Sequence, residues 1–237
     1  MTARRLLPLL LLAASLGATE IKSYKVRLDT TADGTGKGTA EVILSACAPG
    51  RLNLPLGFSG ITGLRLEDSP PRLKLEQGPT NGQALLHLDL AEAVTGEATV
   101  KFSFIVPKAF VNIAPGPGEK STFPAGSRLF RHALVATQEG LIGAYRFELL
   151  FPQGTRAQAI REQLPKLGKF EAGPRVRLGK SEGRQNAVLQ VAALKQGDDT
   201  SLALELVPER KSWGWLVAGL LLSALYLIYF RDLAARD

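Results

Sequence analysis

Two histidines, His87 and His132, are the side chains of this chain best suited to acid–base chemistry near neutral pH. His87 lies two residues before Asp89 in an alternating run, so both side chains are expected on one face of a strand. A carboxylate that orients an imidazole can serve catalysis or metal binding. No nucleophile or further ligand accompanies the pair, which favours an exposed strand pair. His132 alternates with Phe130 and Leu134, which favours a partly buried histidine over a ligand.

The segment 33–39 has the composition of a phosphate-binding loop. It reads Asp-Gly-Thr-Gly-Lys-Gly-Thr and has some similarity to the loop of nucleoside-monophosphate kinases, in which Gly-Lys-Gly-Thr closes the loop. The first Gly of that pattern falls on Thr31, and a strand-like run follows at 40–44 where the motif requires a helix. A glycine-rich hairpin turn is therefore favoured. Asp29 and Asp33 lack the alternating ligand spacing of an EF-hand calcium loop.

No other residues have a catalytic spacing. Cys47 is the single cysteine, so an intramolecular disulfide is excluded, and its place at the end of a strand-like run favours a small packing residue over a reactive thiol. The patterns Gly-x-Ser-x-Gly, His-Glu-x-x-His and Cys-x-x-Cys are missing. We therefore expect no catalytic site, no metal and no cofactor. An exported hydrolase whose site the sequence hides is kept as a third hypothesis.

A basic window at 155–184 is the best candidate for a binding surface. It holds eight basic and three acidic residues, a net charge of +5, whereas 19–106 has 9 basic and 10 acidic residues, a net −1. The basic residues are Arg156, Arg161, Lys166, Lys169, Arg175, Arg177, Lys180 and Arg184. Such a window could contact anionic lipid headgroups, an anionic envelope polymer or an acidic partner, or it could be an ordinary solvated face. Phe170 is its one aromatic residue, which argues against nucleic acid.

Alternating apolar and polar runs recur between 20 and 208 and predict half-buried strands, with turn sequences such as Asn81-Gly82 between them. The predicted fold is all-β and mainly antiparallel, with one or two β-sandwich units of immunoglobulin-like strand count. The expected parts are a β-sandwich domain at 19–106, a Pro/Gly-rich linker or long loop at 107–127, and a second β-rich domain at 128–208 with a short helix near 155–164. Whether the two units share one core is left open.

The two ends of the chain are apolar. Residues 1–18 combine two arginines, a short apolar run and small residues, which predicts a signal peptide, with a retained anchor as the alternative. Residues 213–230 carry no charge and predict a transmembrane helix, followed by a cytoplasmic tail at 231–237. Small residues four apart could form a helix-packing face, or the helix could be a plain anchor. They are Gly214, Ala218, Gly219 and Ser223.

These features together predict a non-enzymatic, single-pass membrane-anchored envelope protein, whose exported β-sandwich region acts as a binding or scaffolding module. The alternative is an accessory subunit of a larger inner-membrane complex. The expected location is a cell membrane, with the bulk of the chain exported, and most consistently a bacterial inner membrane facing the periplasm. The expected partners are the lipid bilayer through 213–230 and either proteins or an anionic envelope polymer, but not nucleic acid.

Overall fold

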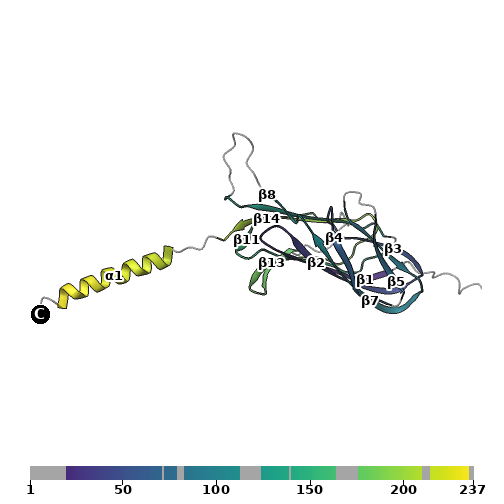
Figure 1. The fold of residues 1–237 in the computed structure, drawn as a ribbon, viewed down its shortest axis with the longest axis horizontal. Coiled ribbons are helices and arrows are strands. Elements are labelled where there is room, and N and C mark those ends of the chain that lie inside the picture. The colour runs from purple at the N-terminus through teal and green to yellow at the C-terminus, as the bar shows by residue number, and fades with distance from the viewer. Residues whose placement is uncertain are drawn as a thin grey trace, which may run out of the picture.

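A computed structural model describes residues 20–70, 72–78, 83–112, 124–138, 140–163, 176–209 and 214–234 of the chain (Figure 1). These residues form three β-sheets and a C-terminal helix. The prediction of a mainly antiparallel β fold is confirmed. The expected immunoglobulin-like character stays a prediction. The expected signal peptide lies outside the described residues, as does the larger part of the expected linker.

The largest sheet has seven strands in the order β12-β13-β10-β1-β2-β7-β4. Their bounds are β1 (Glu20–Thr30), β2 (Gly36–Cys47), β4 (Thr62–Asp68), β7 (Val94–Val106), β10 (Tyr145–Leu150), β12 (Val176–Ser181) and β13 (Arg184–Val191). β1 pairs in parallel with β10, and the other neighbours in this sheet are antiparallel. This one parallel contact joins the two halves of the sequence within a single sheet.

Two smaller antiparallel sheets complete the β structure. The four-stranded sheet has the order β11-β14-β9-β8, with β8 (Phe110–Asn112), β9 (Arg128–Val135), β11 (Thr155–Gln163) and β14 (Asp199–Pro208). The three-stranded sheet has the order β3-β6-β5, with β3 (Gly50–Pro55), β5 (Leu73–Gln77) and β6 (Leu85–Leu90). The glycine-rich segment at 33–39 forms the hairpin connection and the start of the strand after it, as predicted, since β1 and β2 pair antiparallel on either side.

The prediction of a short helix near 155–164 is wrong, because Thr155–Gln163 form the edge strand β11. β11 pairs antiparallel with β14, and its register shifts between Ala157 and Ala159. Alternate residues of β11, among them Ala157 and Ala159, are half-buried, whereas Ile160 is 40% exposed. The helical spacing of Ala157 and Ile160 therefore does not mark one buried face.

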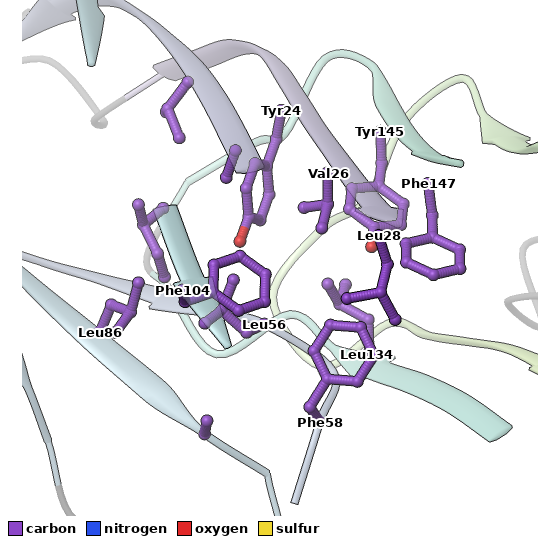
Figure 2. Close-up of a cluster of buried hydrophobic side chains, with 14 of the residues drawn as sticks. Tyr24, Val26, Leu28, Leu56, Phe58, Leu86, Phe104, Leu134, Tyr145 and Phe147 are labelled. Carbon is purple, nitrogen blue, oxygen red and sulfur yellow. The ribbon is translucent and has the colours of Figure 1, made fainter. Parts of the chain in front are cut away.

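One hydrophobic core joins the three sheets, because the buried side chains of both halves belong to a single cluster. Phe147 of β10 stacks on Phe130 of β9, with ring centroids 5.8 Å apart. The hydroxyl of Tyr24 donates a hydrogen bond to the carbonyl oxygen of Pro55 in β3, at 2.9 Å. Figure 2 shows Tyr24, Phe58 and Phe147 converging in this core. The inner face of the seven-stranded sheet thus packs on both smaller sheets.

The C-terminal helix α1 (Gly214–Ala234) lies apart from the sheets in Figure 1. Within the described residues, no helix is both long enough and apolar enough to cross a membrane. The predicted transmembrane helix at 213–230 is therefore not supported.

The functional prediction that depended on this helix is corrected with it. Without a membrane-spanning helix in the described part of the chain, the membrane-anchored envelope module and the inner-membrane accessory subunit both lose the element on which they were built.

Candidate functional site

The outer face of the seven-stranded sheet is the most highly charged surface that the strands build. In β1, Tyr24, Val26 and Leu28 are buried, so the alternation of the strand directs Lys25 and Arg27 to the opposite side. The same alternation operates in β2, β7 and β10, whose apolar residues face the core. Each strand therefore contributes polar residues to one continuous outer surface.

Strand register brings charges of both signs side by side on this face. Lys25 of β1 lies opposite Arg146 of β10 on one side and Glu41 of β2 on the other. Glu41 in turn lies opposite Lys101 of β7. Neighbouring strands are about 4.8 Å apart, so these four residues form a row of cross-strand neighbours. A second row begins with Arg27, which lies opposite a glutamate of β10.

A shallow depression of about 470 Å³ lies over these rows, and we call it the outer groove. It is lined by Lys25, Val26, Arg27, Thr39, Ala40, Glu41, Glu67, Lys101, Arg146 and Glu148. Seven of these ten residues are charged, four basic and three acidic, so the groove offers partners to both anions and cations. No aromatic residue is among them, which disfavours stacking of a sugar or a base.

The charges of the outer groove are partly satisfied by one another. Lys25 Nζ lies 2.9 Å from a carboxylate oxygen of Glu41, and this hydrogen bond is the main cause that lowers the pKa of Glu41. Arg146 lies 3.5 Å from Glu148, which also accepts a hydrogen bond of 2.8 Å from the side-chain amide of Asn186. Pairs on a solvated surface exchange partners at little cost. A ligand with charges of both signs can therefore replace these contacts.

His132 is part of the core and not of a site. Its side chain is buried, and desolvation lowers its pKa to about 3, although the Gly57 backbone opposes this shift. Burial also raises the pKa of Tyr145, whose hydroxyl is hydrogen-bonded to His132 Nε2 at 2.8 Å. His132 is thus fully buried, more deeply than the partly buried position that the sequence predicted.

His87 and Asp89 lie on the same face of β6, but the structure gives them different partners. His87 Nδ1 is 2.7 Å from the side-chain oxygen of Asn53, while Asp89 forms two contacts with Arg51, at 2.7 and 3.1 Å. Hydrogen bonding to the Arg51 guanidinium lowers the pKa of Asp89. The imidazole is thus not oriented by this carboxylate. Across the described ranges, no three His, Cys, Asp or Glu side chains are placed to hold a metal ion.

The described residues of the basic window do not form one patch. Arg156 is exposed on β11, whereas Arg177 and Lys180 lie on opposite sides of β12, in another sheet. Arg184 of β13 is 2.8 Å from Asp29, so an ion pair already engages it. Lys166, Lys169, Arg175 and the side chain of Arg161 lie outside the described residues.

The small residues of the predicted helix-packing face all lie in α1. Ala218, Gly219 and Ser223 are exposed, and the Ser223 hydroxyl donates to the carbonyl oxygen of Gly219 at 2.8 Å. Gly214 is the first residue of the helix. The role of these residues stays a prediction.

The residues of the outer groove were missed as a site by the sequence reasoning. Their strands were predicted from alternation, but β1 and β10 are more than one hundred residues apart in the chain. The alternating runs around Lys25 and Arg146 carried the outward charges, and no local signal indicated that these two strands pair.

No known protein family matches the sequence, nor does any curated protein. Several solved structures resemble the fold at low sequence identity. A Parabacteroides distasonis protein provisionally described as a protease matches 79% of this chain and 40% of its own, with 10% identity and a TM-score of 0.47. An M1 zinc metallopeptidase from Deinococcus radiodurans matches 79% and 42%, with 9% identity and a TM-score of 0.40.

Native leukotriene A4 hydrolase from Saccharomyces cerevisiae matches 79% of this chain and 29% of its own, with 8% identity and a TM-score of 0.42. The chain thus spans less than half the length of each of these three structures. At these identities and TM-scores, the likeness supports no inference about the chemistry of this protein.

Proposed function

We propose that this chain is a non-catalytic binding domain, which recognises a polypeptide partner through the outer groove of the seven-stranded sheet. The observation that carries the proposal is the interleaving of four basic and three acidic residues on the lining of one groove. These residues come from β1, β2, β4, β7 and β10, so the charged surface crosses five adjacent strands, about 19 Å at ~4.8 Å per strand. This width suits a protein surface better than a small molecule.

The presence of both positive and negative charges in the outer groove favours some classes of partner over others. An anionic polymer would meet Glu41, Glu67 and Glu148 as well as the basic residues, and like charges across an interface cost binding energy. Small-molecule sites are usually mostly apolar, whereas seven of the ten residues that line this groove are charged. A polypeptide carries carboxylates together with lysine or arginine side chains, and so it can match both signs.

Neither histidine is placed to act as a general base. A general base must reach its substrate, but His132 is buried and held neutral by desolvation. His87 is occupied by Asn53 and packs so tightly on Gly78 that a Cβ atom at position 78 would lie 2.2 Å from its ring. We therefore assign recognition, not turnover, to this domain.

Site-specific crosslinking in the cells that naturally produce the chain tests the proposal. A photo-crosslinking residue replaces Thr39, which is exposed in the outer groove, and in a control chain it replaces Gln153, which is exposed in the turn after β10. We expect one discrete protein adduct from position 39 and none from position 153. The absence of an adduct at position 39, or equal adducts at both positions, would contradict the proposal.

Charge reversal tests whether recognition is electrostatic. Lys101→Glu with Arg146→Glu changes two groove residues, while Arg156→Glu with Lys195→Glu makes the same change in net charge at exposed positions elsewhere. The Lys101→Glu and Arg146→Glu pair should lower the yield of the adduct at least about tenfold, because like charges then face each other across the interface. The second pair should leave it unchanged. Persistence of the adduct in the first pair would exclude the groove as the contact surface.

A further inference from the structure

A second depression, of about 480 Å³, lies away from the outer groove and has a different charge pattern. We call it the loop pocket. It is lined by Gly57, Phe58, Ser59, Gly60, Ile61, Thr62, Val106, Pro107, Lys108, Ala109, Arg131 and Ala133. Two of these residues are charged, Lys108 and Arg131, and both are basic. We propose that the loop pocket binds a small organic molecule through its oxyanion, a phosphate or a carboxylate.

Strand pairing brings the two cations to the same place. Phe110 of β8 lies opposite Phe130 of β9. Lys108 is two residues before Phe110 and Arg131 is one residue after Phe130, so both stand at the same end of this short antiparallel pairing. Both side chains are exposed, and each lines the pocket.

No described residue neutralises either cation. Within the part of the chain that the structure describes, Lys108 and Arg131 form no ion pair, whereas Lys25 and Arg184 each have a carboxylate partner within 3 Å. The pocket lining contains no acidic residue that could serve as one. The lining therefore presents two cations and no carboxylate, and an oxyanion bound there can accept hydrogen bonds from both.

The loop after β3 supplies further donors. Ser59 and Gly60 are exposed, and among the described residues their backbone amides donate to no backbone acceptor. A Cβ atom at position 60 would meet no atom within 4 Å, so the backbone there is open to a ligand. Ser59 and Thr62, which carry hydroxyl groups, line the same pocket. Backbone amides and hydroxyls complement the two cations as phosphate or carboxylate donors.

The floor of the pocket is apolar and well fixed. Phe58 and Ile61 are buried, and the Phe58 ring packs on His132, with centroids 5.0 Å apart, and on Phe104 at 6.0 Å. The Gly57 carbonyl oxygen accepts a hydrogen bond of 3.3 Å from the Ala133 amide, which ties the loop to β9. An apolar floor below a basic rim suits a ligand with a small apolar body and one anionic group.

Calorimetric titration of the full chain with three phenyl compounds tests the proposal. Phenyl phosphate and benzoate carry the oxyanion, and phenol carries the ring alone. We expect at least one of the two anions to bind at least about tenfold more tightly than phenol, because charged hydrogen bonds contribute more than neutral ones. Preference for phenyl phosphate would indicate a phosphate ester as the natural ligand, and preference for benzoate an organic acid. Equal binding of all three compounds, or no binding of either anion at millimolar concentration, would overturn the proposal.

Paired variants then assign the binding to the loop pocket. Lys108→Gln with Arg131→Gln should weaken anion binding at least about tenfold, while Arg156→Gln with Lys195→Gln removes the same two charge types elsewhere and should leave it unchanged. Unchanged circular dichroism and melting temperature would show that both proteins fold. Equal losses in both variants would mean that net charge, and not the pocket, attracts the anion. The result does not depend on the outer groove, so the two proposals can fail separately.

Discussion

The two faces of the seven-stranded sheet are formed by the same strands, but one face is buried and the other is exposed to solvent. On the inner face, Tyr24, Phe147 and their neighbours are buried against the two smaller sheets, where packing is dense and each side chain has a fixed place. On the outer face, Lys25, Glu41 and Arg146 stand in water, and their contacts are weak and exchangeable.

This difference separates stability from function along each strand. A substitution at an inward position should change the free energy of unfolding, whereas one at the next residue should change binding and leave the fold intact. The loop pocket lies at the boundary between these regimes, because its floor belongs to the core and its rim is charged. The predictions below test the contrast between the faces, beginning with the largest expected effect.

Truncation of Phe147 on the inner face should cost the most stability. Its ring is fully buried and stacks on Phe130 and on His132, with centroids 5.8 and 4.0 Å apart. We expect Phe147→Ala to lower the free energy of unfolding by about 3–5 kcal/mol, because it removes buried apolar surface and leaves a cavity. Arg146→Ala, one residue away on the outer face, is the matched control and should cost less than about 1 kcal/mol. Urea unfolding measures both, and similar losses would contradict the division between the faces.

Acidification should destabilise the protein through the inner face. The pKa of His132 is about 3 in the folded protein and about 6.5 when the chain is unfolded, because burial disfavours the charged imidazole. The unfolded chain therefore binds more protons between these values, and stability falls as pH drops through 6.5 towards 3. Between pH 7 and pH 5, His132 should contribute a loss of about 2 kcal/mol.

A variant identifies the source of this pH dependence. His132→Gln removes the titrating group and keeps an amide that can accept from Tyr145, so its stability should depend less on pH over the same interval. His87→Gln is the control, since His87 lies in the three-stranded sheet with Asn53 as its partner. If unfolding curves of His132→Gln and the parent chain change equally with pH, the buried neutral imidazole is not the cause.

The ion pair between Lys25 and Glu41 should contribute least. The two side chains are 52% and 34% exposed, so solvent screens their 2.9 Å contact. A double-mutant cycle with Lys25→Ala and Glu41→Ala should give a coupling energy of about 0.2–1 kcal/mol, smaller at 1 M salt. A coupling above about 2 kcal/mol that persists in salt would mean that the outer face behaves as a rigid part of the fold.

Much of the fold could be predicted from the alternation of apolar and polar residues, because side chains of a half-buried strand face the core at every second position, whatever strand it pairs with. The runs around Tyr24, Phe102 and Phe147 indicated both the strands and their inward side chains. The prediction of a helix near 155–164 was wrong, because Ala157 and Ile160 have helical spacing but lie on an edge strand in which Ile160 is exposed. The apolar C-terminal run was correctly read as a helix, but the inference of a membrane span from it was not supported.

The candidate sites could be predicted from the sequence to a much smaller extent. Local spacing drew attention to the basic window and the histidines, yet the structure distributes Arg156 and Arg177 over different sheets and buries His132. Lys108 and Arg131 have no sequence pattern in common, since they meet only through the β8–β9 pairing. A charge becomes part of a site through its neighbours in space, and these were set by strand order.

The amino-acid sequence by itself determined the local conformation: which residues form strands, and which of two successive side chains in a strand faces the core. Those choices follow from side-chain periodicity and burial, which act within a few residues. Only the tertiary structure decided that β1 lies beside β10, that Lys25 meets both Arg146 and Glu41, and that two cations share the loop pocket. Such contacts depend on strand order and register, which arise from the packing of the whole core and leave no local mark in the chain.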